Sequence, residues 1–182
     1  MPVIACLGWG SLVWDARTLP IQRTWFTDGP FAQIDFLRQS QDGRMTLVLD
    51  ATASSVRTLW AVMDSANLDG ARDALRAREG SAVRHIGSWS RGGAASPLIV
   101  ELPAWAEARG IDSVVWTALP PKSHNDDGRV PTADEVITYL SSLTGRVRED
   151  AERYIRRAPA QIDTPYRRKI EASLSWTPTA MP

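Results

Sequence analysis

An unbroken apolar run near the start of the chain, Val3–Gly8 (VIACLG), restricts the fold more than any other feature of the sequence. The run is too short for a helix and ends in glycine, so we expect it to form a strand. Because all of its side chains are apolar, the strand needs cover on both faces. This places it in the interior of a closed or nearly closed sheet.

Further strands and a helix are expected before residue 120. The dipeptide Asp42-Gly43 favours a two-residue type I′ turn, which would make a hairpin of the segments 32–40 and 45–50. Helical spacing predicts a helix over 68–79 that ends at Gly80, and a shorter helix around 105–108. The remaining strand candidates are residues 56–63, 83–89 and 113–119.

The pattern becomes helical after Pro120-Pro121 and a polar loop at 122–129. Thr132 and Glu135 have the spacing of a capping box, and Thr164-Pro165 has the form of an N-cap followed by a first helical residue. A further helix is expected between them. We therefore predict an α+β protein with a strand-rich part at 1–119 and a C-terminal helical segment at 120–182 packed on the same domain.

Composition excludes several classes of function. The chain has 21 Lys and Arg against 21 Asp and Glu, so no overall field attracts a polyanion and nucleic acid is not expected as a partner. No apolar stretch approaches the roughly 20 residues of a membrane span, and the first residues contain no basic region. The single cysteine, Cys6, excludes an internal disulfide. We expect a cytoplasmic protein that does not bind membranes.

The two histidines do not suggest a metal site. His85 and His124 stand without Cys or acidic residues at ligand spacing, so we expect neither a metal nor a cofactor.

The loop after the first strand, Gly8-Trp9-Gly10-Ser11-Leu12, is the first candidate site. It is not a dinucleotide fingerprint, because Val13 occupies the place of the third glycine, and it is not a nucleophile elbow, because Trp9 stands where the serine would be. It offers the amides of Gly10, Ser11 and Leu12 and one hydroxyl, which suit a carboxylate or an oxyanion. The alternative is a tight turn whose glycines allow close packing of Trp9 and its neighbours.

Glu79 is the second candidate. On a helical wheel drawn from Leu68, Leu75 and Glu79 fall about 20° to either side, so this acid lies on the inward stripe. Both burial and the helix C-terminus disfavour the charged carboxylate, which would suit it to proton transfer. The alternative is a structural ion pair with Arg72, which shares that face of the helix.

The Gly-Trp-Gly-Ser-Leu loop and the helix end Arg78-Glu79-Gly80 together resemble the gamma-glutamylcyclotransferase-like family over residues 3–119. The resemblance implies a small mixed β-barrel surrounded by helices, so that residues 1–119 form a barrel domain that carries the site. It also implies that Trp9, Gly10, Ser11 and Leu12 bind the glutamyl group and that Glu79 is the general acid and base. Trp9 replaces the family's usual tyrosine, and Ser81-Ala82-Val83 replaces the Gly-Tyr that often follows the acid.

The function implied is intramolecular aminolysis of a gamma-glutamyl amine or a related amide, catalysed by a transferase or lyase that releases 5-oxoproline and a free amine. Such a reaction needs a folded-back substrate, a proton carrier and donors for the oxyanion. A non-catalytic module that binds a carboxylate on the same fold is the alternative. A third is an interaction protein that uses the basic segment 146–171.

Overall fold

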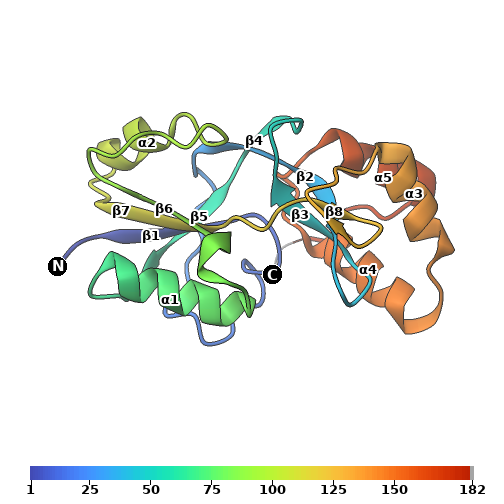
Figure 1. Cartoon of the computed structure of the whole chain (residues 1–182), viewed down its shortest axis with the longest axis horizontal. Coiled ribbons are helices and arrows are strands. Elements are labelled where there is room, and N and C mark those ends of the chain that lie inside the picture. The colour runs from blue at the N-terminus through green and yellow to red at the C-terminus, as the bar shows by residue number, and fades with distance from the viewer. Residues whose placement is uncertain (181–182) are drawn as a thin grey trace. The chain divides into compact units, whose positions relative to one another are not determined.

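A computed structural model describes residues 1–180 of the chain and divides it into two compact units (Figure 1). Unit 1 comprises Met1–Ala32 and Arg57–Leu119, and unit 2 comprises Gln33–Val56 and the chain from Pro120 onward. Within the described residues there are five α-helices and two curled sheets, one of them a half-barrel, so the protein is α+β. One stretch of unit 1 ends at residue 119, and the hairpin region 33–56 groups with the C-terminal helices.

The sheet of unit 1 has the strand order β5-β1-β7-β6. Strand β1 is antiparallel to β5 and parallel to β7, and all five of its residues are buried. This confirms the interior strand expected from the first apolar run. The bounds of the four strands are β1 Ile4–Gly8, β5 Leu59–Met63, β6 Ile86–Ser90 and β7 Ser113–Thr117.

Two helices, α1 (Leu68–Glu79) and α2 (Leu102–Ala108), lie on opposite sides of this sheet (Figure 1). Helix α1 packs against β6 and β7 and buries Leu75 in a cluster with residues of the sheet. Both helices were expected. The strand expected at 83–89 was partly wrong, because Val83–His85 forms a 3-10 turn, η1, before β6 begins.

Unit 2 contains the second sheet, whose strand order is β3-β2-β8-β9, with β4 also paired to β2. The strand expected at 56–63 is divided at the buried Thr58, because β4 belongs to this sheet and β5 to the sheet of unit 1. The strands are β2 Phe31–Gln39, β3 Met45–Leu49, β4 Ser55–Arg57, β8 Lys122–Ser123 and β9 Asp126–Asp127.

The turn between β2 and β3 differs from the expected type I′ turn. The Ser40 amide donates to the Arg44 carbonyl at 2.8 Å, which leaves three residues in the loop, and Gly43 has a φ of +85°. Asp42 is not among the positive-φ residues of the described chain, so only Gly43 takes the left-handed conformation. The two consecutive positive φ values of a type I′ turn occur instead at His124 and Asn125, between β8 and β9.

Three helices complete unit 2: α3 (Ala133–Ser142), α4 (Gly145–Arg157) and α5 (Pro165–Leu174). The Thr132–Glu135 capping box is present, and the Thr164 side chain accepts a hydrogen bond from the third residue of α5, as expected. The apolar stripes are buried, α4 packs against β3, and α3 packs against α5. The helical segment is therefore packed and is not a free arm. No helix within residues 1–180 has the length and apolar character needed to cross a bilayer.

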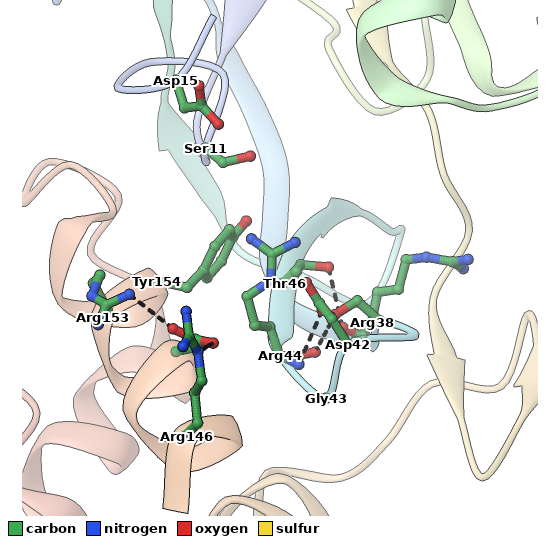
Figure 2. A network of polar contacts seen from close by, with 12 residues as sticks. Ser11, Asp15, Arg38, Asp42, Gly43, Arg44, Thr46, Arg146, Arg153 and Tyr154 are labelled. Carbon is green, nitrogen blue, oxygen red and sulfur yellow. Dashed lines mark hydrogen bonds and ion pairs between the residues drawn. The ribbon is translucent and has the colours of Figure 1, made fainter. Parts of the chain in front are cut away.

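Polar side chains join the helices of unit 2 to its hairpin. The Tyr154 hydroxyl accepts from the Leu47 amide at 3.3 Å, and the Arg44 guanidinium lies over the Tyr154 ring and pairs with Asp42 at 2.7 Å (Figure 2). The buried Asp35 of β2 accepts a hydrogen bond from the Thr164 hydroxyl at 2.5 Å. Burial raises the pKa of Asp35 despite this hydrogen bond.

Arg167 is the largest fully buried side chain of unit 2, with 1% of it exposed. Its guanidinium donates to four backbone carbonyls at the end of α4 and in the segment that follows, at 2.7 to 3.2 Å. These carbonyls belong to Ile155, Ala158, Pro159 and Ile162. Carbonyls at a helix C-terminus have no partner inside the helix, so Arg167 acts as the cap of α4.

Candidate functional site

The loop that follows β1 is held by its own hydrogen bonds and by two buried side chains. The Val13 amide donates to the Gly10 carbonyl at 3.0 Å, and the Asp15 amide donates to the Ser11 carbonyl at 2.8 Å. Trp9 and Leu12 are buried, which fixes the loop to the core of unit 1. The tight turn that we considered as an alternative is thus part of the geometry.

Gly8 is required where the loop leaves the strand. A Cβ atom at this position would lie 2.6 Å from the Trp25 ring, a distance that real Cβ contacts essentially never show. Any side chain here would displace Trp25, and the loop would start from a different position.

Three successive amides of the loop, those of Gly10, Ser11 and Leu12, donate to no protein acceptor within residues 1–180. Adjacent free N–H groups attract a carboxylate or a developing oxyanion. These are the donors expected from the sequence; Gly10 and Leu12 are buried and Ser11 is half-buried. That it binds a ligand stays a prediction.

Helix α1 ends next to this loop, and its cap fixes the positions of its last residues. Gly80 has a φ of +60°, and its amide donates to the Ala77 carbonyl at 3.3 Å, which closes the final turn. Glu79 in that turn has 14% of its side chain exposed, in agreement with the inward stripe expected from the helical wheel.

Arg78 connects the loop to Glu79. Its side chain is 5% exposed; Nη1 donates to Glu79 Oε1 at 2.8 Å and Nη2 donates to Ser11 Oγ at 3.3 Å. Its Nε donates to the Asp15 carbonyl at 3.2 Å, and Nη2 donates to the same oxygen. Figure 2 shows Ser11 and Asp15 on this loop. One guanidinium thus links the two candidate features that the sequence identified separately.

The expected alternative pairing of Glu79 was wrong. Arg72 pairs within its own helix with Asp69, at 4.0 Å, and Glu79 pairs with Arg78 instead. The helical wheel places Arg76 and Arg78 symmetrically beside the inward stripe, at about 80° on either side. Arg76 is 42% exposed and pairs with Asp73, so only the position of the loop distinguishes the two arginines. Sequence reasoning missed Arg78 for this reason.

Cys6 of β1 lies close enough to interact electrostatically with this pair. Burial raises the pKa of its thiol strongly, the charge of Glu79 raises it further, and Arg78 acts in the opposite direction. A thiol that stays protonated is a poor nucleophile. Cys6 is completely buried and belongs to the hydrophobic core cluster of unit 1.

Unit 2 has a cavity of its own of about 420 Å³, which the sequence did not indicate. One face of α3 lines it with Asp134, Thr138 and Ser142, and the turn that contains His124 lines another side. Arg129 orders this turn through hydrogen bonds to His124 Nδ1 and, at 2.9 Å, to the hydroxyl of the preceding serine. No local sequence pattern predicts this cavity, because its lining residues come from three separate segments of the chain.

Within the part of the chain that the structure describes, no group of three or more His, Cys, Asp or Glu side chains could hold a metal ion. The groups gathered at the loop and the end of α1 are the three amides, the Ser11 hydroxyl, the Glu79 carboxylate and the buried guanidinium of Arg78. Comparison of the chain with protein-family models, curated proteins and solved structures finds no match.

Proposed function

We propose that this protein is a gamma-glutamylcyclotransferase-like enzyme with the corresponding barrel-type fold. The observation that carries the proposal is the arrangement around Arg78. One guanidinium donates hydrogen bonds both to the Glu79 carboxylate and to the loop that contains the three free amides. A proton carrier beside oxygen-binding donors is what cyclisation of a gamma-glutamyl amine needs.

In this proposal the free amides of Gly10, Ser11 and Leu12 bind an oxygen of the glutamyl group. Glu79 accepts a proton from the substrate's α-ammonium group, and the resulting amine attacks the γ-carbonyl carbon. A carbon–nitrogen bond forms in the five-membered ring, and the bond to the leaving amine breaks. Glu79 then returns the proton to the leaving nitrogen and accepts the second proton of the ring nitrogen, which passes to the released amine, so the products are 5-oxoproline and an ammonium.

One observation favours the alternative, a non-catalytic module that binds a carboxylate at the same loop. Glu79 already shares a hydrogen-bonded ion pair with Arg78, and that pair needs no reaction to account for the acid. In this alternative the loop amides bind a ligand and Glu79 only neutralises the buried arginine.

The test compares amine release from a panel of gamma-glutamyl compounds by the wild type, Glu79→Gln and the control Glu107→Gln, whose residue is exposed on α2. General acid and base catalysis contributes about 10²- to 10⁴-fold, so Glu79→Gln should lower kcat at least about a hundredfold while the control leaves it unchanged. Binding of 5-oxoproline, measured by calorimetry, should survive in Glu79→Gln.

Other results would decide against the enzyme. If the wild type releases no amine from the panel but binds 5-oxoproline, the binding module replaces it. If it does neither, both readings of the loop are wrong. A Glu79→Gln variant that keeps full turnover would exclude Glu79 as the proton carrier.

A further inference from the structure

We infer that Arg78 is a positioning residue, which holds the Ser11–Asp15 part of the loop and the Glu79 carboxylate in a fixed mutual geometry. The kinetic part of this inference rests on the proposed function, whereas its structural part does not. The sequence places Arg78 in the helix end Arg78-Glu79-Gly80 but assigns it no role of its own.

The burial of Arg78 is the first argument. An arginine in the last turn of a helix can reach solvent and interact with the helix dipole from there. Arg76 does extend into solvent, with 42% of its side chain exposed, whereas Arg78 has 5% exposed. Taking a guanidinium out of water is costly unless its donors are all engaged, so the environment of Arg78 has to satisfy it.

The distribution of its donors is the second argument. Nε and Nη2 both donate to the Asp15 carbonyl, Nη2 reaches the Ser11 hydroxyl, and Nη1 reaches Glu79 Oε1. These acceptors come from a loop and a helix more than sixty residues apart in sequence. A planar group with fixed donor directions can hold three acceptors in one geometry, whereas a lysine ammonium is a single point charge and cannot.

The backbone of Arg78 makes a further contact with the same loop. Its carbonyl accepts a hydrogen bond from Arg17 Nη1 at 3.5 Å, and Arg17 also pairs with Asp15 at 3.4 Å. The loop is therefore attached to the end of α1 through both the side chain and the main chain of one residue. The exposed Arg17 contact adds little, so the buried guanidinium is the main attachment.

Two consequences follow for the site. Without Arg78 the loop loses two of its attachments to α1, and the three free amides lose their fixed direction. The Glu79 carboxylate also becomes free to rotate away from the substrate. Misplacement by about 1 Å can lower a rate about a hundredfold, so Arg78→Met should lower kcat on that scale.

The test uses Arg78→Met, Arg78→Lys and the control Arg76→Met, with two readouts. The structural readout is hydrogen exchange of the Val13 and Asp15 amides, whose hydrogen bonds lie inside the loop. Exchange should accelerate about tenfold or more in both Arg78 variants and stay unchanged in Arg76→Met. The melting temperature shows whether each variant is folded. If Arg78→Met does not fold, the comparison is made with Arg78→Lys.

The kinetic readout is a double-mutant cycle of amine release with Glu79→Gln. If Arg78 acts partly through Glu79, Arg78→Met should lower kcat less in the Glu79→Gln background than in the wild type, because the part of its effect that passes through Glu79 is already lost and the two losses are not additive. A residue that only stabilises the fold would give additive effects. Arg78→Lys should restore less than about a tenth of the lost rate.

The inference is overturned if loop exchange is unchanged in both Arg78 variants or if the kinetic losses are additive. If the wild type releases no amine, the proposed function fails, and the exchange experiment alone decides whether Arg78 holds the loop. The two failures are therefore distinguishable.

Discussion

The replacement Arg167→Met tests the most heavily hydrogen-bonded side chain of unit 2. Methionine fills much of the volume of the arginine stem, so the change mainly removes the guanidinium. Four carbonyls accept from it at 2.7 to 3.2 Å in a site where the side chain is 1% exposed. The Pro159 carbonyl keeps a hydrogen bond from the Ile162 amide at 2.9 Å, so the change removes a donor that is not replaced from the other three. At about 1 kcal/mol or more for each of these three buried acceptors, the free energy of unfolding should fall by about 3 kcal/mol.

A loss of that size is a large part of the roughly 5 to 15 kcal/mol that stabilise a typical domain. Urea unfolding, followed by circular dichroism and by tryptophan fluorescence, measures it. Arg168→Met is the matched control, because Arg168 is the next residue, is 66% exposed and pairs with Asp163 at the surface. The control should leave the urea midpoint almost unchanged, because an exposed ion pair contributes little to stability. If Arg167→Met and Arg168→Met unfold at the same urea concentration, the carbonyls do not depend on Arg167 and the reasoning fails.

The remaining predictions concern charge and chain length. Glu79→Gln should lower the free energy of unfolding by about 1 to 3 kcal/mol. The amide keeps a hydrogen bond to Arg78, but the buried guanidinium loses its counter-charge. An unchanged urea midpoint would contradict this. Because the pKa of Asp35 is raised, the folded state binds the proton more tightly than the unfolded state. The free energy of unfolding of the wild type should therefore fall, relative to that of Asp35→Asn, as the pH rises from the ordinary value of 3.8 through the raised pKa. Parallel curves of stability against pH for the two proteins would refute this. Truncation after Pro131 removes α3 to α5 and should abolish cooperative unfolding of unit 2, whereas an unchanged melting temperature would show that the hairpin is stable without the helices.

Patterns with a local physical cause were predicted accurately. The apolar run produced β1, and helix α1 begins and ends where the spacing and Gly80 indicated. The capping box at Thr132 and the N-cap at Thr164 are also present. In each case the interactions that decide the structure lie within a few residues, so the sequence contains them in readable form.

Features that depend on distant contacts were not predicted. The division of 56–63 at Thr58 follows from pairing with two different sheets, which no local pattern records. The turn at Asp42-Gly43 took a three-residue form, and the side chain of Asp42, which pairs with Arg44, forms part of that turn. The burial of Arg78 likewise depends on a loop more than sixty residues earlier in the chain.

The composition of unit 2 from two separate stretches of sequence affects how the chain folds during synthesis. The hairpin of β2 and β3 is complete by residue 49, but its Leu47 amide and Asp35 carboxylate meet their partners only when Tyr154 and Thr164 have been made. At about 5 to 20 residues per second, the roughly one hundred intervening residues take several seconds to about twenty seconds to translate. For that time the apolar face of the hairpin has no helix to cover it, and it is open to chaperones or to other nascent chains.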